Sequence, residues 1–530
     1  MNDFLKPTLE YFELSPLLVV FAVACLGVLV EAFLGRELRR VVQPVLAVVG
    51  LLGALVLTVL VGTGLGEHGD GAARGIVGGM GTIVVDGPGV FLWGTILVVS
   101  VLGAMLFAER RLDGGVSAFA GQAAALPGTD AERQAASKGL EHTEVYPLMV
   151  FSVFGMLMFV VAGDLITLFV ALEVLSLPLY LLSGLARRRR LLSQEAALKY
   201  FLLGAFSSGF FLYGAALLYG YAGAMDFASI HNAVANDVGN STMLAIGTGL
   251  LAVGLLFKVG AVPFHSWTPD VYQGAPTPVT AFMAAGTKIA AFGAMMRLFY
   301  VALGEDRWSW QPMMMVIAVL TMVFGTVLAI TQSDVKRLLA YSSVAHTGFI
   351  LVGVLGLQGA GELGEGQISS TQAVLFYLVS YGFTMLGAFA LVGLVRDGGG
   401  ETSQLERWRG LGTESPVVAS VMALLLLSMA GIPLTAGFIG KWAVFSAAAS
   451  SGAWLVVGVA IVSSVIAIWL YLRVIVVMFS RSGDGPAPSV ALPSVLTTVV
   501  ITVAGVTTVV LGVLPGPVLD LAAHAGEWIR

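Results

Sequence analysis

The stretch GLLFKVGAVPFHSWTPDVYQGAPTPVTAFMAAGTK, residues 254–288, decides the fold of this chain. It begins as an apolar helix that contains Lys258, and Pro263 interrupts this helix five residues later. The chain then resumes as a second apolar helix that carries Lys288. An ammonium group at bilayer depth costs about 3 kcal/mol or more and usually has a task. Two lysines around one broken helix therefore predict an ion pathway. The alternative is that both lysines extend to the membrane interface.

The composition is that of a membrane protein. Of the 530 residues, 57% are hydrophobic and only 11% are charged, whereas soluble proteins carry about 25% charged residues. The N-terminal segment lacks the basic region that marks a cleaved signal peptide, so residues 15–34 are predicted to be a first span that is retained.

Residue counts exclude several kinds of chemistry from the chain. A single cysteine, Cys25, cannot hold an iron–sulfur cluster or form a disulfide within the chain. The six histidines include no HExxH pair, and Gly440-Lys441 is followed by Trp442 instead of the Ser or Thr of a nucleotide-binding loop. We therefore predict no metal, no cofactor and no nucleic acid bound to this chain, and we expect any redox chemistry in partner proteins.

Apolar segments long enough to cross a bilayer recur along the whole chain. A helix needs about 20 residues to cross the hydrocarbon core, and counting on this basis predicts an all-α polytopic membrane protein with about 14 spans. The predicted spans lie near residues 15–34, 41–65, 88–108, 146–162, 164–185, 195–221, 243–265, 278–303, 312–331, 335–357, 371–395, 415–448, 453–479 and 492–515. The twelfth is too long for one crossing and contains Gly431 and Pro433, so a second broken helix is expected there.

The basic residues outside the spans are divided unequally between the two sides of the membrane. One set of alternate loops, which includes Arg187 to Arg190, holds most of the 27 lysines and arginines. The opposite loops and the two termini hold only Lys6, Arg74, Arg307 and Arg530. Because basic loops face the cytoplasm, both termini are predicted on the outer side of the membrane.

The two breaks indicate an internal repeat. The seventh and twelfth spans each break beside a lysine. The twelfth comes five spans after the seventh, and because five is an odd number the two cross the membrane in opposite directions. The two units are therefore predicted to be inverted repeats, as in many transporters. The predicted organisation is three N-terminal helices (1–108), a polar cytoplasmic loop (109–145), a first repeat (146–303), a second repeat (312–479) and a last helix (492–530). We assign no chemistry to the loops 66–87, 397–401 and 480–489.

Charged side chains are predicted in the middle of the bilayer. Glu173 and Lys288 lie about nine and ten residues into their spans, which places both roughly 13 to 15 Å deep. Lys258 and Lys441 lie beside the breaks, where half-helix ends can stabilise ions. Desolvation favours a neutral amine and a nearby carboxylate favours the charged form, so a Glu173–Lys258 pair that opens and closes would move protons. The alternative is a static ion pair that joins two helices.

Three further residues are candidates for the same path. His346 lies within the tenth span and could relay protons between the lysines, or form a hydrogen bond to a neighbouring helix. His265 could line an uptake path for protons, or hold the turn at the first break. Lys199 follows Glu195 by four residues, a spacing that favours a local ion pair, with a role in proton uptake as the alternative.

Four separated motifs lie within residues 146–450: LEVLSLPLYLLSG (172–184), VPFHSWTPDVYQGAPTPVTAF (262–282), KRLLAYSSVAHTGF (336–349) and AGIPLTAGFIGKW (430–442). They resemble the antiporter-like subunits of respiratory complex I, the proton-pumping NADH:quinone oxidoreductase. The form PDVYQGAPTPVTAF resembles the subunit N branch of that family.

The resemblance implies a fold of fourteen helices with inverted repeats, in the bacterial inner membrane. It implies a proton-translocating subunit that is driven by quinone chemistry elsewhere, with flavin and iron–sulfur clusters in partner subunits. The implied neighbours are a subunit M-like protein on one side and small membrane subunits on the other. By their motifs, the side chains that correspond to the proton relay of the family are Glu173, Lys258, Lys288, His346 and Lys441.

Two other functions stay open at this point. A stand-alone cation/proton antiporter subunit would share the same lysines, although the PDVYQGAPTP motif resembles the complex I subunit more closely. A structural membrane subunit would use the same polar residues only to hold helices together.

Overall fold

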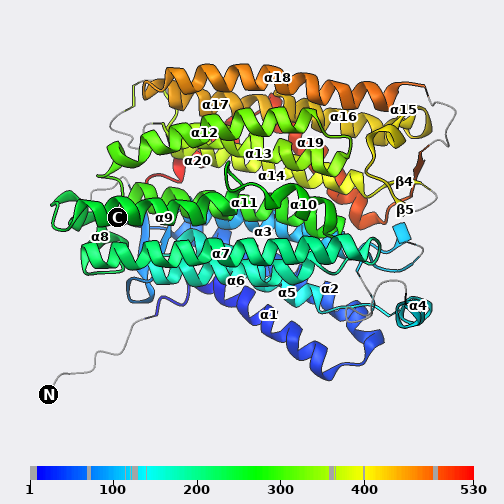
Figure 1. The fold of residues 1–530 in the computed structure, drawn as a ribbon. Coiled ribbons are helices and arrows are strands. Elements are labelled where there is room, and N and C mark those ends of the chain that lie inside the picture. The colour runs from blue at the N-terminus through cyan, green and yellow to red at the C-terminus, as the bar shows by residue number, and fades with distance from the viewer. Residues whose placement is uncertain are drawn as a thin grey trace.

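The helices form one bundle and lie side by side with roughly parallel axes (Figure 1). The computed structural model describes residues 9–68, 73–113, 115–119, 121, 129–138, 140–356, 363–364, 366–397, 400–481 and 488–529. We call the end of the bundle that carries Arg187 to Arg190 the arginine-rich end. The opposite end, where the C-terminus lies, is the C-terminal end.

Twelve helices in the described part of the chain are long and apolar enough to cross a membrane. They are α1 (Ser15–Phe33), α2 (Arg36–Gly64), α3 (Gly87–Phe107), α6 (Leu165–Ser183), α7 (Arg190–Ala222), α9 (Ser241–Val259), α11 (Thr277–Arg297, continued by the π-helix η3, Leu298–Ala302), α12 (Arg307–Ile330), α13 (Val335–Val354), α14 (Ser370–Val392), α18 (Trp454–Phe479) and α19 (Val495–Val513). Two shorter apolar helices, α5 (Val145–Val161) and α16 (Pro416–Ala430), coincide with two more predicted spans. The helical membrane fold is confirmed, and the number of fourteen crossings stays a prediction.

Both predicted helix breaks are present. After α9, Gly260 adopts the left-handed conformation with φ 73°, and the short helix α10 (Trp267–Gly274) follows after a gap. After α16, Gly431 has φ 81°, and α17 (Ala436–Ser450) follows. Glycine suits both positions because it has no Cβ to clash at positive φ. The first helix therefore ends at a glycine cap, three residues before Pro263.

Two small sheets lie in segments that were predicted as loops. The first has the order β1-β2-β3 and the second the order β5-β4-β6, and all their strand pairs are antiparallel. The strands are β1 (Glu67–His68), β2 (Ala73–Gly78), β3 (Ile83–Asp86), β4 (Val395–Asp397), β5 (Gly400–Glu401) and β6 (Ser489–Val490). β1, β4, β5 and β6 are too short to show the alternation that identifies a strand in a sequence, and the sequences of β2 (ARGIVG) and β3 (IVVD) do not alternate between apolar and polar residues.

The predicted loop 109–145 is not entirely irregular. It contains the short helices η2 (Arg111–Asp113) and α4 (Asp130–Ser137), whereas positions 114, 120, 122–128 and 139 lie outside the described residues. The remaining short helices are η1 (Gly79–Gly81), α8 (Phe227–Ala235), η5 (Leu405–Trp408), α15 (Leu411–Glu414) and α20 (Gly516–His524).

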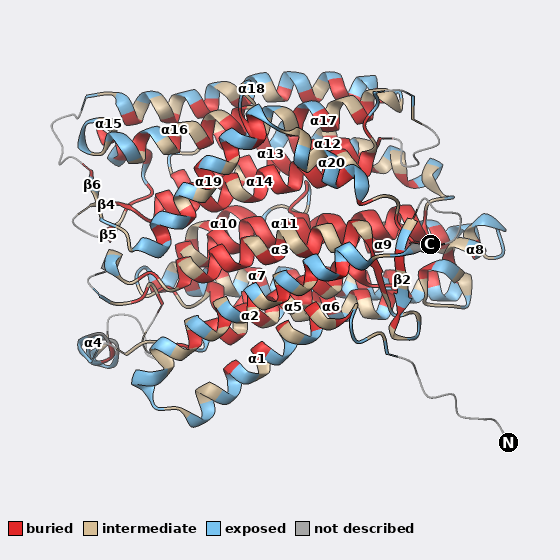
Figure 2. Cartoon of the chain, turned by 180° about the vertical axis from the view of Figure 1, so that it is seen from behind, coloured by how far each residue is buried: buried red, intermediate tan, exposed pale blue. Residues whose placement is uncertain are grey.

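The bundle has inner and outer helices (Figure 2). The spans of α11 and α14 are completely buried and that of α13 nearly so, whereas only 33% of the spans of α1 and α2 is buried. The outer helices expose Leu, Val and Phe side chains, which suits contact with lipid tails. The inner helices α11 and α13 carry Lys288 and His346, so these polar groups lie in the protein interior.

A buried ion pair fixes the C-terminal end of the bundle. Arg297 Nη2 lies 2.6 Å from Asp86 Oδ1, and both side chains are fully buried. The Arg297 Nε group donates to Val160 O at 2.7 Å, and its guanidinium lies 4.7 Å from the centre of the Trp528 ring. The Ile529 backbone N–H donates to Asp86. One ion pair therefore joins α11, the start of α3, α5 and the C-terminal segment.

Replacing Arg297 with methionine is expected to destabilise the fold by about 3–5 kcal/mol, because Asp86 would remain as an unpaired buried charge. The melting temperature of the purified protein in detergent measures the effect. Arg36 is exposed, so Arg36→Met is the matched control. Equal melting temperatures for the two variants would show that the buried pair does not hold this end together.

Candidate functional site

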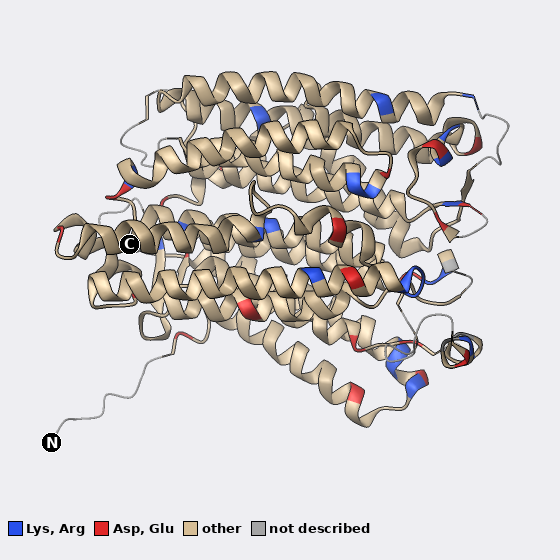
Figure 3. Cartoon of the chain, in the orientation of Figure 1, with Lys and Arg blue, Asp and Glu red and all other residues tan. Residues whose placement is uncertain are grey.

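Four ionisable side chains lie buried inside the bundle, each on a different helix. They are Lys258 on α9, Lys288 on α11, His346 on α13 and Lys441 on α17, and none is more than 4% exposed. Most other charged residues lie toward the two ends of the bundle (Figure 3). The three lysines therefore do not reach the outer surface of the bundle, which argues against the alternative that they extend to the membrane interface.

Lys258 is held by hydroxyl groups and aromatic rings. Its ammonium donates to Ser176 Oγ at 2.8 Å and to Tyr200 Oη at 3.3 Å. It also lies 5.5 and 6.0 Å from the ring centres of Tyr200 and Tyr180, at cation–π distance. These partners come from α6 and α7, so the lysine connects three helices.

The expected contact between Glu173 and Lys258 is not formed among the described residues. Lys258 binds the two hydroxyls instead, and Oε1 of the half-buried Glu173 has no hydrogen-bond partner there. Ser176 lies three residues after Glu173 on α6, and residues at this spacing share a helix face. The carboxylate is therefore next to the hydroxyl that holds the amine, and a side-chain movement can exchange one partner for the other.

Lys288 is bound by a backbone carbonyl and a hydroxyl of α13. Its ammonium donates to Ser343 O at 2.5 Å and to Thr347 Oγ1 at 2.6 Å. Thr347 Oγ1 also lies 2.8 Å from the carbonyl oxygen of Val259, the residue that follows Lys258. Polar contacts thus run from Lys288 to the helix end that carries Lys258.

Both ring nitrogens of His346 face tyrosine hydroxyls. Nδ1 lies 2.7 Å from Tyr377 Oη, and Nε2 lies 3.3 Å from Tyr471 Oη. Tyr471 Oη lies 2.5 Å from Ser342 Oγ. A neutral imidazole has one donor and one acceptor nitrogen, so it can take a proton from one tyrosine and give a proton to the other. The predicted hydrogen bond to a neighbouring helix and a relay role are thus compatible.

Lys441 is bound at the second helix break. Its ammonium donates to the carbonyl of Ala430, the last residue of α16, at 3.0 Å, and to Ser464 Oγ at 2.9 Å. The carbonyl end of a helix carries a partial negative charge, which favours a cation. The Phe349 ring centre lies 4.8 Å away. The break therefore provides the partner for this ammonium.

The two candidates for proton uptake lie outside this group of four. Lys199 contacts both Glu195 and Asp270 at 2.7 Å, so the predicted local pair is present, and the side chain is 42% exposed. Arg337 also binds Asp270, at 2.6 Å, and this cluster joins α7, α10 and α13. His265 is half-buried, and its Nδ1 has no hydrogen-bond partner within the described ranges.

A further buried lysine lies at the arginine-rich end. Lys336 Nζ contacts Glu401 Oε1 at 2.5 Å and Thr277 Oγ1 at 2.6 Å. Burial raises the pKa of the Glu401 carboxyl, but the Lys336 ammonium and the Thr277 hydroxyl outweigh it and hold this pKa below its ordinary value. Residues 397–401 were assigned no chemistry from the sequence, so this carboxylate was missed.

Sequence reasoning identified the buried charges but not the groups that hold them. Ser176 lies one helical turn from Glu173, and this spacing was a usable signal. Tyr377 and Tyr471 come from helices that are distant in sequence, and no local pattern points to them. In the part of the chain that the structure describes, no group of three His, Cys, Asp or Glu side chains is placed to hold a metal ion.

Comparison with known proteins gives consistent matches. The family model described as "NADH:quinone oxidoreductase/Mrp antiporter, TM" matches residues 162–467. The NADH-quinone oxidoreductase subunit N of a Nocardioides species is 68% identical over 532 residues, which covers 100% of both chains.

Two solved structures have the same fold. A chain in the structure of respiratory complex I from Thermus thermophilus with bound aureothin is 31% identical, with a TM-score of 0.75. The match covers 97% of this chain and 100% of that one. A chain in the Mrp complex from a Dietzia species also has a TM-score of 0.75, with coverage of 97% and 96%. At 22% identity, this second likeness concerns the fold alone.

Replacing Gly431 with alanine is expected to destabilise the fold by about 1–3 kcal/mol, because other residues rarely adopt its positive φ. An added Cβ would also lie 2.9 Å from Cδ of Lys441 and displace this side chain. Gly458→Ala in α18 is the matched control, since no atom lies within 4 Å of its added Cβ. A melting temperature for Gly431→Ala equal to or above that of the control would contradict the role of the break.

Proposed function

We infer the function from one premise: the chain belongs to the NADH-quinone oxidoreductase subunit N family. It is a membrane subunit of a proton-translocating NADH-quinone oxidoreductase. We propose that it moves protons along Lys258, Lys288, His346 and Lys441, with Glu173 as the carboxylate that controls Lys258. One observation carries this proposal: hydroxyls and backbone carbonyls bind the three buried amines, and no carboxylate contacts them among the described residues.

This arrangement suits reversible protonation. An ammonium that is locked to a carboxylate keeps its proton, whereas an amine among neutral hydroxyls can lose it. Approach of Glu173 favours the charged form of Lys258, and withdrawal of Glu173 favours proton release toward Lys288. His346 then passes the proton between its two tyrosine partners on the way to Lys441. Each transfer breaks one N–H or O–H bond and forms another, so the number of protons is conserved.

The wider organisation follows as part of the same proposal. Residues 146–303 and 312–479 form two inverted repeats, and the equivalent glycine-capped breaks beside Lys258 and Lys441 support this division. The arginine-rich end faces the cytoplasm, and both termini lie on the outer side of the bacterial inner membrane. A subunit M-like neighbour and small membrane subunits flank the chain. Flavin and iron–sulfur clusters in partner subunits carry the electrons.

A cation/proton antiporter subunit is the second candidate, because the matching family description includes Mrp antiporters. The two functions differ in the source of energy. Proton transport that requires quinone reduction supports the oxidoreductase, whereas proton transport that an imposed sodium gradient can drive supports the antiporter.

Replacing Lys258 with alanine in the complete complex is expected to lower NADH-driven proton pumping at least about tenfold, because a proton-carrying group is lost. Pumping is measured in proteoliposomes with a pH-sensitive dye, together with quinone reduction and subunit content. Lys138 is exposed, so Lys138→Ala is the matched control. Normal pumping by an assembled Lys258→Ala complex would favour the structural subunit instead.

Replacing Glu173 with glutamine is expected to lower turnover about tenfold while the complex still assembles, a loss of roughly 1.4 kcal/mol. Glutamine has nearly the same size but lacks the charge that stabilises the Lys258 ammonium. Glu195→Gln, at a largely exposed carboxylate, is the control. Failure of only the Glu173→Gln complex to assemble would indicate a packing role for this side chain.

A further inference from the structure

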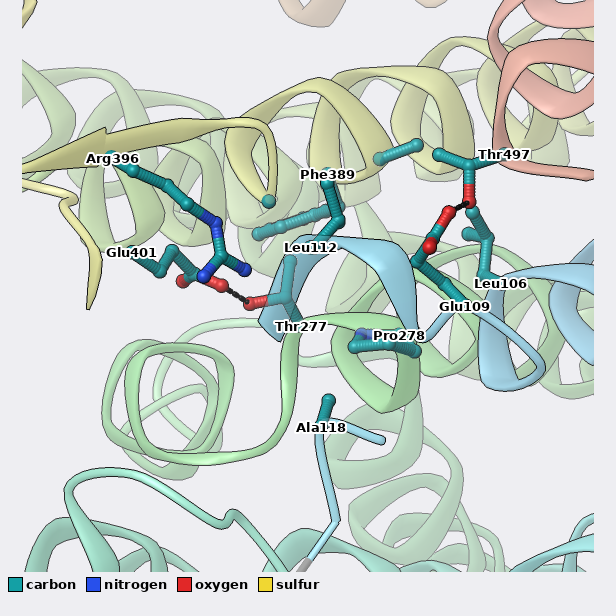
Figure 4. Close-up of a pocket in the computed structure, with 12 residues that line it drawn as sticks. Leu106, Glu109, Leu112, Ala118, Thr277, Pro278, Phe389, Arg396, Glu401 and Thr497 are labelled. Carbon is teal, nitrogen blue, oxygen red and sulfur yellow. Dashed lines mark hydrogen bonds between the residues drawn. The ribbon is translucent and has the colours of Figure 1, made fainter. Parts of the chain in front are cut away.

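Two adjoining cavities lie at the arginine-rich end. The smaller has a volume of about 50 Å³ and the larger about 370 Å³, and both are lined by Thr277, Arg396 and Glu401. Figure 4 shows the smaller cavity with these three side chains around it. Since one water molecule needs about 10–15 Å³ of such space, both cavities have room for water.

Glu401 connects this space to the two helices that carry the inner relay residues. Its carboxylate accepts hydrogen bonds from Thr277, the first residue of α11, and from Lys336, the second residue of α13. Lys288 and His346 lie ten or eleven residues further along these helices, roughly 15 Å deeper into the bundle. A carboxylate beside a water-sized cavity is thus hydrogen-bonded to the outer ends of both helices.

Glu109 is the other carboxylate of the smaller cavity, and it has a different task. It accepts from the Thr497 hydroxyl at 2.6 Å and from the Ser494 backbone N–H at 2.8 Å, and so holds the start of α19. Burial raises the pKa of Glu109, but the hydrogen bonds from Thr497 and Ser494 outweigh it and lower this pKa overall. Of the two carboxylates, only Glu401 contacts the relay helices.

Buried Tyr272 contacts a residue that lines the smaller cavity and neighbours a residue that binds Lys288. Phe389 lines the cavity (Figure 4), and its ring packs edge-on against Tyr272, with 5.8 Å between the ring centres. Tyr272 is fully buried, and its hydroxyl faces the side chain of Ser343 on α13. Ser343 O accepts from Lys288. Tyr272 is not among the residues that line either cavity, so cavity water has to pass Phe389 to reach its hydroxyl.

We propose that these cavities form the proton inlet of the chain, with Glu401 as the proton acceptor and Tyr272 as the hydroxyl that delivers protons to Lys288. The inference rests on the proposed function and adds the route by which protons reach it. It assigns uptake to Glu401, which lines both cavities, in place of Lys199, which is not among the lining residues of either.

The transfer conserves protons and charge. A proton from water binds a carboxylate oxygen of Glu401, and the neutral acid then gives it to cavity water. Tyr272 accepts a proton from this water on its oxygen and releases its own to the neighbouring Ser343 hydroxyl, which in turn gives its proton to the Lys288 amine. Glu401 returns to the carboxylate, and the Lys288 amine gains one proton. Phe389 lies between the cavity and Tyr272 and limits how much water reaches the relay.

The test uses the complete complex in proteoliposomes and two single variants, Glu401→Gln and Tyr272→Phe. Each is expected to lower NADH-driven pumping at least about tenfold, because each removes a proton-carrying group. The solvent deuterium isotope effect on turnover should rise in both, which a purely structural change would not cause. Glu401→Asp keeps the carboxylate and should restore much of the pumping.

Glu406→Gln is the control, because Glu406 is a carboxylate nearby in the sequence that is 75% exposed and paired with Arg409. If either Glu401→Gln or Tyr272→Phe pumps like this control, the inlet is wrong. If Glu401→Gln prevents assembly, Tyr272→Phe decides alone, since it removes one oxygen atom only. Loss of pumping in Lys258→Ala together with normal pumping in both inlet variants would refute the inlet and leave the proposed function intact.

Discussion

The burial of Lys258, Lys288 and Lys441, which no carboxylate contacts in the described part of the chain, is the constraint on which the rest of the structure depends. Water is absent from a bilayer interior, so a buried ammonium needs protein dipoles around it. Lys441 obtains them from the carbonyl end of a broken helix, and Lys288 from a backbone carbonyl and a hydroxyl. The second helix break and several inward-facing hydroxyls therefore share one role, which is to give these buried amines neutral partners.

Ion pairs are used elsewhere in the molecule, for a different purpose. Arg297 and Asp86 join helices at the C-terminal end, and Asp270 joins α7, α10 and α13 at the arginine-rich end. A buried pair whose partner is removed leaves an unpaired charge, which strongly disfavours rearrangement. The chain thus uses charge pairs to join helices toward the two ends of the bundle, and neutral dipoles around Lys258, Lys288 and Lys441, along which we propose that protons move.

The sequence predicted the parts of this design that are local. Hydropathy placed Lys258, Lys288 and Lys441 inside the membrane, Pro263 indicated the first break, and Gly431 with Pro433 indicated the second. Contacts between distant segments left no local pattern, so the tyrosine partners of His346 could not be predicted. Glu401 was missed because it follows three glycines in a short connection. Such a sequence predicts a turn and gives no sign of a functional carboxylate. The direct contact between Glu173 and Lys258 was expected from spacing and charge, yet hydroxyls hold the amine instead.

Helix α13 connects these features physically. Lys336, Ser343 and Thr347 are seven and four residues apart, a spacing that places them on one face of a helix, and they contact Glu401 or Lys288. His346 points to a different side, toward tyrosines of α14 and α18. A displacement of α13 would therefore alter the carboxylate at the arginine-rich end, the central lysine and the histidine at the same time. Because α13 lies in the second predicted repeat and α11 in the first, their shared contacts also give the two repeats a means of responding together.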